Sequence, residues 1–428
     1  MKTAMRNIYN SVLVPYHRFR GFLAANHYDY PASSMTVIGV TGTNGKTSTC
    51  FMIYNTLKQA GFNVGMMTTI GNAVADGELQ SKNGHMTTAD TKLVNKQIAE
   101  MRDKGIKYLV LEVSSHALAQ GRIFGIPIDI AVMTNVTPEH LDYHRTFERY
   151  RQAKVKLFNL AADNAKHGGR GIGIINADDP SAQYFLRAVP LAVTYGIENG
   201  DLKATRIKST TKGIEYYTKI NKQTYHIKVN IPGEFYVYNS LAAVAVCHEL
   251  GLSKKQIEEG IASLEGVMGR MDRIDNDRGL NIIVDYAHTP DSYQKMLPGI
   301  YQATTGKTYI ICGAAGQRDR SKFPEMGRLA AKYSDLVILT EEDPKGPVRP
   351  LSELLAEGIR DNGGKEDDDF VFIDDRLMAI KEALKRAKKG DTILLLGMGH
   401  QQTIDRASGT EPWNDAEEVK KVLSEITD

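Results

Sequence analysis

Short apolar runs alternate with stretches of helical periodicity along most of this chain. Continuous apolar runs predict buried strands in the first half of the chain, at 35–40, 108–113, 130–134, 173–176 and 192–195. Apolar residues at helical spacing predict helices at 47–60 and 147–161. Since buried strands that alternate with helices are typical of a parallel sheet, the pattern predicts an α/β fold with a mostly parallel sheet.

The pattern changes at 213–230, where polar and apolar residues alternate on both sides of Asn221-Lys222. This alternation predicts an antiparallel hairpin inserted late in the first domain, followed by helices at 239–250 and 254–263. A second α/β block then begins near residue 266, with strands expected at 281–286, 308–312, 336–340, 370–373 and 391–396. We therefore expect an N-terminal helical appendage at 1–34, a central domain at 35–265 and a C-terminal domain at 266–428.

The first 34 residues are mildly basic and apolar, with polar residues every few positions. They contain neither a transmembrane run of about 18–20 apolar residues nor the continuous apolar core of a signal peptide. We expect an amphipathic helix packed on the first domain, and attachment to a membrane surface is the alternative.

The composition is that of an ordinary globular protein, with 42% hydrophobic and 24% charged residues among 428. Lys and Arg number 53 against 51 Asp and Glu, and a formal charge of +2 gives no strong field that favours a nucleic acid or a membrane partner. Cys50, Cys247 and Cys312 are too scattered for a disulfide framework or a four-thiolate zinc site. We expect a cytoplasmic protein without an integral membrane segment.

A predicted strand runs into Thr41-Gly42-Thr43-Asn44-Gly45-Lys46-Thr47-Ser48 and then into a helix. This is the context of a phosphate-binding loop, in which backbone N–H groups and the helix N-terminus face phosphate oxygens. Lys46 is expected on the β- and γ-phosphates of ATP, and the Thr47 hydroxyl on Mg²⁺. Val40 stands where the strict pattern has its first glycine, so the loop is a variant.

Two further residues follow predicted strands. Glu112 ends the strand at 108–113, and a carboxylate there lies at the edge of a parallel sheet where ligands bind, so it is a candidate Mg²⁺ ligand. His140 follows the strand at 130–134. His140 and His144 are four apart, but neither an adjacent glutamate in the zinc-binding pattern nor a cysteine nearby in sequence supports a zinc site.

The ordered set of motifs resembles the Mur ligase family, and within it the MurE type, from about residue 35 to the C-terminus. The motifs are the loop above, Glu112-Val-Ser-Ser-His116, Thr134-Asn135, His140-Leu-Asp-Tyr-His144, Tyr150-Arg-Gln-Ala-Lys154, Asn176-Ala-Asp-Asp179, Gly233 to Ala243, Gly269-Arg-Met-Asp272 and Asp285-Tyr-Ala-His-Thr-Pro-Asp291. The resemblance implies a central P-loop ATPase domain and a Rossmann-like C-terminal domain. It also implies ATP-dependent ligation of an amino acid to a peptidoglycan precursor, through an acyl phosphate, with Mg²⁺.

The resemblance implies roles for single residues. Lys46, Glu112, His140 and Lys154 would be catalytic, and Lys154 would be carbamylated and lie near Mg²⁺ with Thr47, Glu112 and His140. Residues 42–48, with Asn239, Arg270 and Asp285, would bind ATP. The expected substrate-binding residues are Thr87, Thr88, Ser114, His116, Arg122, His288, Asp343, Lys345, Gly397 and His400.

Three departures from the family pattern concern the substrates. Lys345 replaces the arginine that grips the distal carboxylate of diaminopimelate, and Gln401 replaces a glutamate. Only about 35 residues precede the first strand, so we expect the usual N-terminal UDP-binding domain to be missing.

Three functions remain open. The first is an amide ligase that adds an amino acid to a UDP-N-acetylmuramoyl-dipeptide or a related cell-wall precursor. The second is a polyglutamate- or cyanophycin-type ligase, and the third is a synthetase subunit that receives ammonia from a glutaminase partner. In the first case the partners are small molecules, and we expect a monomer.

Overall fold

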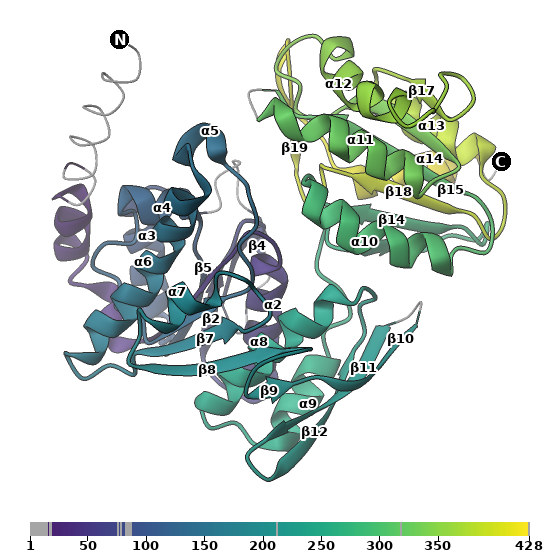
Figure 1. Cartoon of the computed structure of the whole chain (residues 1–428). Helices are drawn as coiled ribbons and strands as arrows, with labels where there is room; N and C mark the ends of the chain where they lie inside the picture. The colour runs from purple at the N-terminus through teal and green to yellow at the C-terminus, as the bar shows by residue number, and fades with distance from the viewer. Residues whose placement is uncertain are drawn as a thin grey trace. The chain divides into compact units, whose positions relative to one another are not determined.

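The computed structural model describes residues 16, 19–74, 77, 79–81, 88–210, 213–316 and 319–426. The chain divides into two compact units (Figure 1). The first unit consists of Met1–Asn230 and Tyr236–Glu265, and the second of Ile231–Phe235 and Gly266–Asp428. Each unit has its own mostly parallel sheet with helices packed against it, which confirms the predicted α/β fold class.

The main sheet of the first unit has the strand order β4-β3-β2-β5-β1-β6-β7-β8-β9. The strands from β2 to β9 in this order run parallel, and β3 and β4 are antiparallel additions at one edge. The central strands are buried on both faces, which explains their continuous apolar sequences. The strand bounds are β1 Thr36–Thr41, β2 Val64–Met67, β3 Gly71–Val74, β4 Gln80–Ser81, β5 Tyr108–Glu112, β6 Ile130–Met133, β7 Ile172–Asn176, β8 Leu191–Gly196 and β9 Leu202–Lys203.

Helices cover both faces of this sheet (Figure 1). Residues of α3, α4, α6 and α7 share one apolar core with alternate residues of β1, β5 and β6, and α2 lies against β1, β2 and β5. Helix α6 begins where Thr146 accepts a hydrogen bond from the backbone of Arg149, and it extends four residues beyond the predicted end. The helix bounds are η1 Pro31–Ser34, α2 Lys46–Gln59, α3 Thr91–Asp103, α4 Ser115–Gln120, α5 Leu141–His144, α6 Phe147–Ala165, α7 Ala182–Leu186, α8 Phe235–Glu249 and α9 Lys254–Ala262.

The predicted hairpin at 213–230 is confirmed as β11 Gly213–Ile220 and β12 Gln223–Val229, joined at Asn221-Lys222. The prediction missed a third strand, β10 Thr205–Thr210, which pairs antiparallel with β11. Most of β10 is exposed and polar, so its sequence carries no alternation that would mark a strand.

The N-terminal segment is helical at 19–27 and packs on the first unit through small residues. Gly21 lies against Phe124, and Ala25 lies against Gly125, close enough that a side chain on either glycine would collide. The backbone carbonyl of Tyr28 accepts a hydrogen bond from Arg102 at 3.0 Å.

The second unit has a sheet in the order β13-β14-β18-β15-β16-β17, parallel except for β13. A separate hairpin pairs β19 with β20. The predicted strands correspond to β14–β18, whereas β13, β19 and β20 were not predicted. The bounds are β13 Asp272–Ile274, β14 Asn281–Asp285, β15 Thr308–Ala314, β16 Leu336–Glu341, β17 Phe370–Phe372, β18 Thr392–Leu396, β19 Thr403–Arg406 and β20 Gly409–Pro412.

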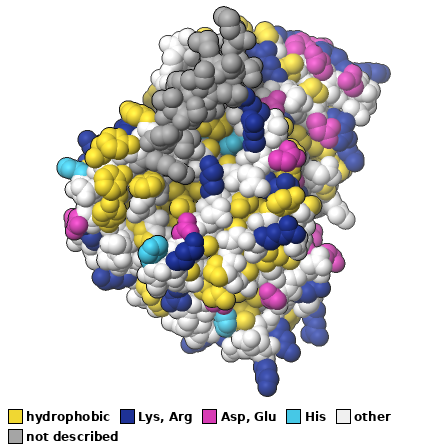
Figure 2. Space-filling model, turned by 60° about the vertical axis from the view of Figure 1, so that its left-hand side comes forward, with side chains coloured by type: hydrophobic (Ala, Val, Ile, Leu, Met, Phe, Trp, Pro, Cys, Tyr) yellow, Lys and Arg dark blue, Asp and Glu magenta, His cyan; other side chains and the backbone are white. Residues whose placement is uncertain are grey.

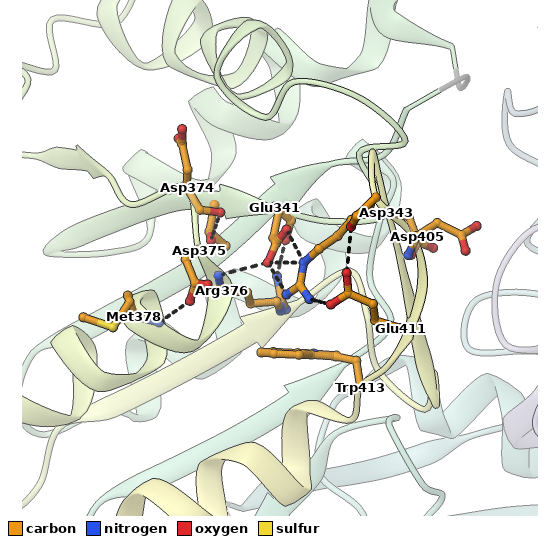
Figure 3. A network of polar contacts seen from close by, with 12 residues as sticks. Glu341, Asp343, Asp374, Asp375, Arg376, Met378, Asp405, Glu411 and Trp413 are labelled. Carbon is orange, nitrogen blue, oxygen red and sulfur yellow. Dashed lines mark hydrogen bonds and ion pairs between the residues drawn. The ribbon is translucent and has the colours of Figure 1, made fainter.

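The helices of the second unit are α10 Pro290–Ala303, α11 Phe323–Lys332, α12 Arg349–Arg360, α13 Arg376–Arg386 and α14 Asp415–Ile426, with the short η2 Arg320–Lys322. Arg376, at the start of α13, is fully buried and holds three elements together (Figure 3). Its guanidinium donates to both carboxylate oxygens of Asp415 at 2.7 Å and to the backbone carbonyls of Glu341 and Leu396. The carboxyl ends of β16 and β18 are therefore fixed to α14.

Among the described residues, none of the helices combines the length and the apolar character that a membrane crossing requires.

Candidate active site

The predicted phosphate loop lies between β1 and α2, as the sequence indicates. Gly45 has a φ of +81°, and a Cβ at this position would collide with the side-chain oxygen of Asn239 on α8. Lys46 donates from Nζ to the backbone carbonyl of Thr43 at 2.8 Å. The loop thus brings Gly45 and Asn239, two of the expected nucleotide-binding residues, into contact.

Residues after β6 fix the loop from its other side. The amide of Asn135 accepts from the backbone N–H of Asn44 at 2.9 Å and donates to the Asn44 carbonyl at 3.0 Å. The hydroxyl of Thr134 donates to the same carbonyl, and the backbone N–H of Thr43 donates to the carbonyl of Asn135 at 2.8 Å. The loop is therefore held in shape before any phosphate binds.

Glu112 is 1% exposed at the end of β5 and is bound to the start of α2. Its Oε2 accepts from the Thr47 hydroxyl at 3.0 Å and from the backbone N–H of Thr69 at 2.9 Å. The Thr69 hydroxyl donates to Oε1 at 2.9 Å. The carboxylate thus lies beside the threonine expected to bind Mg²⁺.

Lys154 on α6 is 1% exposed and points at the phosphate loop. Its Nζ donates to the carbonyl of Gly42 at 2.5 Å and lies 4.5 Å from the ring centre of Tyr150. Burial, and then the nearby charge of Lys46, lower the pKa of Lys154 well below its usual value, against the charges of Glu139 and Glu112. A neutral amine is the form that can act as a nucleophile, so Lys154 is chemically unlike a surface lysine.

Tyr150, one turn before Lys154, connects several of these groups. Its hydroxyl lies 3.0 Å from that of Thr43, and its ring centre lies 6.2 Å from that of His140. Burial raises the pKa of Tyr150 well above its usual value, so the hydroxyl stays protonated. The sequence showed Tyr150 only as part of a motif, and its position between loop and histidine comes from the structure.

Three histidines gather beside this site. The ring of His116 lies 4.7 Å from that of His140 and 5.4 Å from that of His144. His140 Nε2 lies 3.6 Å from Oε2 of Glu139, a carboxylate that the sequence analysis did not single out. Burial lowers the pKa of His144 to about 3, helped by the charges of His116 and Lys154, and its Nε2 lies 3.0 Å from the hydroxyl of Ser115. His144 is therefore neutral at physiological pH.

The predicted substrate residues of this unit lie near Glu112. The Thr88 hydroxyl donates to the Glu112 carbonyl at 3.2 Å, and the Thr88 carbonyl accepts from Arg122 at 2.8 Å. The Ser114 side chain caps α4. Thr87 lies outside the described residues. Burial lowers the pKa of the Arg122 guanidinium.

The residues present suit Mg²⁺ better than a transition metal. In the described part of the chain, no three His, Cys, Asp or Glu side chains come together as a metal cluster. Mg²⁺ is held in nucleotide sites by one or two protein oxygens, with water and phosphate completing its shell. The paired oxygens of Thr47 and Glu112 fit that requirement.

The remaining predicted residues lie in the second unit, where Arg270 precedes β13 and the others lie at or after the carboxyl ends of β14, β16 and β18. Asp285 accepts from the backbone N–H groups of Met271 and Ala287 at 2.7 Å, and the Arg270 guanidinium lies 4.5 Å from the ring centre of Tyr286. Burial raises the pKa of Asp285, opposed chiefly by the charge of Arg270.

Two predicted histidines of this unit both lie beside Tyr286. The rings of His288 and His400 lie 4.7 Å and 5.0 Å from that of Tyr286, and the backbone N–H of Gly397 donates to the carbonyl of Asp285. The unit therefore brings both histidines and Gly397 to the loop that follows Asp285.

The residues expected at the amino-acid acceptor are already engaged. Asp343 accepts from the Gln401 side chain at 3.1 Å and from the backbone N–H of Asp405 at 2.9 Å (Figure 3). Lys345 Nζ lies 3.1 Å from the carboxylate of Asp405. Neither Asp405 nor its pairing with Lys345 was predicted, because the two lie sixty residues apart in sequence.

Family models and curated relatives of this chain all point to the Mur ligases. The family model of the Mur ligase middle domain matches 40–247, and that of the Mur ligase glutamate ligase domain matches 269–399. The UDP-N-acetylmuramoyl-L-alanyl-D-glutamate--2,6-diaminopimelate ligase 1 of Clostridium acetobutylicum is 36% identical over 94% of this chain and 81% of its own. The UDP-N-acetylmuramyl-tripeptide synthetase of Roseiflexus sp. is 35% identical, with the same coverage.

Solved structures agree in fold. That of a UDP-N-acetylmuramoyl-L-alanyl-D-glutamate--2,6-diaminopimelate ligase has a TM-score of 0.63 at 27% identity, and the match covers 93% of this chain and 80% of that one. The MurF ligase of Thermotoga maritima has a TM-score of 0.70 at 23% identity, covering 96% and 83%, and shows the likeness of fold alone.

Proposed function

Since this chain belongs to the Mur ligase family, we propose that it joins an amino acid to a peptidoglycan precursor, with ATP as the energy source. The carboxylate substrate of the proposal is a UDP-N-acetylmuramoyl-dipeptide or a related muramyl peptide. The names of the relatives, which are ligases and synthetases of such precursors, favour this function over the polyglutamate-type and the partner-dependent alternatives. The chain would act as a monomer in the cytoplasm.

The observation that carries the proposal is the convergence of three groups on one loop. The Thr47 hydroxyl donates to the Glu112 carboxylate at the end of the loop. Lys154 donates to the backbone carbonyl of Gly42, and Lys46 donates to that of Thr43, both within the loop. A γ-phosphate in this loop would meet cations and hydroxyls, with Glu112 beside them. Phosphoryl transfer needs positioning and charge neutralisation of this kind and little covalent help.

The proposed reaction has two steps. A carboxylate oxygen of the precursor attacks the γ-phosphorus of ATP, the bond to the β-phosphate oxygen breaks, and ADP leaves. The amine of the amino acid then attacks the acyl phosphate, phosphate leaves with the bonding electrons, and the amine gives up a proton. Mg²⁺, held by Thr47 and Glu112, would neutralise phosphate charge. Lys46 would hold the β- and γ-phosphates in place throughout.

Lys154 enters the proposal as a carbamate. Its neutral amine would attack CO₂ and release one proton, which leaves a carboxylate at the end of an extended side chain. The lowered pKa supports this step, because only the neutral amine has a lone pair to donate. The carbamate would also replace a neutral amine beside the phosphate loop with an anion that can face a metal ion.

The amino acid added is the open part of the proposal. Several relatives are named as 2,6-diaminopimelate ligases. In this chain, however, Lys345 stands at the position expected to hold the distal carboxylate of diaminopimelate, and it is paired with Asp405. A lysine ammonium group that already pairs with one carboxylate holds a second carboxylate less well than an arginine guanidinium, which can donate two parallel hydrogen bonds. Which amino acid the enzyme adds is therefore to be determined by testing a panel of amino acids as acceptors.

The test is to trap the acyl phosphate with hydroxylamine, using Mg·ATP and UDP-N-acetylmuramoyl-L-Ala-D-Glu without an amino acid. The wild type should form ADP and the hydroxamate, and Lys46→Ala and Lys154→Ala should form neither. Lys156→Ala, an exposed lysine on the same helix, is the matched control and should behave as the wild type. A short carboxylic acid, but not bicarbonate, should restore part of the activity of Lys154→Ala.

Two results would contradict the proposal. Hydroxamate formation by Lys154→Ala at the rate of the wild type would exclude the carbamate. Absence of both hydroxamate and ADP in the wild type, with this and with UDP-free muramyl peptides, would exclude the ligase reaction on this class of precursor.

A further inference from the structure

Glu342, the residue after β16, carries a buried carboxyl group that the reaction described above does not use. Its side chain is 6% exposed, and no described residue gives its Oε2 a hydrogen bond. Acids at the surface are hydrated and stand among Lys and Arg, as Figure 2 shows on one face of the molecule. A carboxyl group that leaves water without gaining a partner costs free energy. Such an oxygen in a native fold indicates a partner that the chain itself does not supply.

The cations whose charges act on Glu342 are Arg376 and Lys322, and both donate their hydrogen bonds elsewhere. The Arg376 guanidinium donates to both carboxylate oxygens of Asp415 and to two backbone carbonyls. Lys322 donates from Nζ to the backbone carbonyl of His288 at 2.7 Å. The carboxyl group of Glu342 is therefore left to a ligand that brings its own donor.

Two glycines make room for this carboxyl group at the edge of the sheet. A Cβ on Gly397, after β18, would lie 1.9 Å from Oε2 of Glu342, and a Cβ on Gly313, in β15, would lie 2.8 Å from its Cβ. The carboxyl ends of parallel strands are where α/β sheets bind their ligands. Asp343 and Lys345, which are expected at the amino-acid acceptor, follow Glu342 in sequence. The carboxyl group thus lies among the expected acceptor residues.

The second step of the proposed reaction needs a group of this kind. Near neutral pH the amino acid carries an ammonium group, which has no lone pair and cannot attack the acyl phosphate. A base must first remove a proton from it. A buried carboxylate without a partner attracts an ammonium ion and can accept that proton.

The charges around Glu342 adjust it to this task. Burial raises the pKa of Glu342 to about 7. The charges of Arg376, at the start of α13, and of Lys322, on η2, oppose this rise, whereas those of Asp343 and of Asp415, on α14, add to it. A general base is most effective when its pKa lies near the pH at which it works.

Two other titratable side chains interact with Glu342. Burial raises the pKa of Tyr293, on α10, well above its usual value, and it raises the pKa of Cys312, on β15, to about 12. Both groups therefore stay neutral at physiological pH. Of these three side chains, Glu342 is the one that changes its charge near pH 7.

We propose that Glu342 is the general base of the second step and that its carboxylate receives the ammonium group of the incoming amino acid. This inference rests on the proposed ligase function. One N–H bond of the ammonium group breaks, its electron pair stays on nitrogen, and the proton binds a carboxylate oxygen of Glu342. The neutral amine attacks the carbonyl carbon of the acyl phosphate, and the departing phosphate takes the bonding electrons and a second proton from nitrogen. Glu342 returns its own proton to water when the product has left.

The experiment measures the two steps separately in the wild type, Glu342→Gln, Glu342→Asp and the control Glu357→Gln, which changes an exposed carboxylate of the same unit. Hydroxylamine trapping reports on the first step, because hydroxylamine is a neutral nucleophile at pH 7.5 and needs no base. Product mass reports on the second step, with a panel of the common amino acids and 2,6-diaminopimelate, and the variants are compared on the amino acid that the wild type accepts.

Glu342→Gln should still form the hydroxamate, but its kcat for transfer to the amino acid should fall at least about a hundredfold. Glu342→Asp keeps a carboxylate and should recover part of the transfer, and Glu357→Gln should match the wild type. In the wild type, kcat/KM for transfer should rise with a midpoint near pH 7 and then level off. In Glu342→Gln it should keep rising about tenfold per pH unit through pH 8.5, because only amine that is already free can react.

Four results would overturn the proposal. Equal transfer by Glu342→Gln and the wild type would exclude a base at this position, and loss of hydroxamate in Glu342→Gln and Glu342→Asp would assign Glu342 a structural role. A raised KM with unchanged kcat and unchanged pH profile would make Glu342 an anchor for the ammonium group only. A wild type that forms no hydroxamate, or transfers to no member of the panel, would overturn the proposed function and this inference with it.

Discussion

The buried carboxyl group of Glu342, directly after β16, should make the stability of the second unit depend on pH. Burial raises the pKa of Glu342 from 4.5 to about 7, and the charge of Arg376 is the largest influence in the other direction. Between these two values the native state holds a proton that the unfolded chain has lost. The contribution of Glu342 to stability is therefore most favourable below about pH 4.5, becomes less favourable as the pH rises toward 7, and is constant above it.

The size of the effect follows from the shift. About 2.5 pKa units correspond to about 3 kcal/mol of unfolding free energy that Glu342 removes at pH 8. Relaxation around an ionised carboxylate reduces such a value, so we expect about 1–3 kcal/mol. Glu342→Gln keeps the shape of the side chain without the charge, and should restore this amount at pH 8.

Urea unfolding followed by tryptophan fluorescence measures this directly. Trp413 is the single tryptophan of the chain and is buried in the second unit, so its signal reports on that unit. Glu342→Gln should be more stable than the wild type at pH 8 and nearly equal to it at pH 5. Glu357→Gln, which changes an exposed carboxylate on α12, should have no such effect. A difference that is the same at pH 5 and pH 8 would refute the reasoning.

Three further predictions concern single groups. Arg376→Ala should cost the second unit about 3–5 kcal/mol because it leaves the buried carboxylate of Asp415 without its cation, with only the Trp413 indole still donating to it. Adding Asp415→Ala should cost little more, and urea unfolding measures both variants. Gly45→Ala should weaken binding of a fluorescent ATP analogue at least about tenfold, because a Cβ at φ +81° meets Asn239; unchanged affinity would contradict the loop geometry. The His144 ring should show no titration by NMR between pH 5 and 8, since burial keeps its pKa near 3, and a midpoint near 6.5 would contradict its burial.

Features that lie in consecutive residues could be predicted from the sequence. The phosphate loop needs a strand, a glycine-rich turn and a helix in direct succession, and all three are present at 36–59. Glu112 was singled out as a candidate because it ends a continuous apolar strand, and it does end β5. The order of motifs gave the family, since each motif could be read by itself.

Contacts between distant segments could not be predicted. Thr69 binds Glu112 from 43 residues away, and Asn239 reaches Gly45 from α8. Nothing in the local pattern of β10 marks it as a strand, because its stability comes from pairing with β11 and not from an apolar face.

The N-terminal helix shows a different limit. The amphipathic pattern of residues 1–34 predicted a helix packed on the first domain, and within the described residues a helix at 19–27 packs on the first unit. Which face packs could not be predicted, because the usual expectation places large apolar residues inward. The close approach of Gly21 and Ala25 to the unit reverses that expectation.

The most direct test of the central claim is ADP release by the purified chain with Mg·ATP, UDP-N-acetylmuramoyl-L-Ala-D-Glu and a panel of amino acids, with product masses measured in parallel. We predict ADP release that depends on one amino acid, and a product heavier than the precursor by that amino-acid residue. Lys46→Ala should abolish both signals. Release of ADP without any change in precursor mass, across the whole panel and with UDP-free muramyl peptides, would contradict the assignment as an amino-acid ligase.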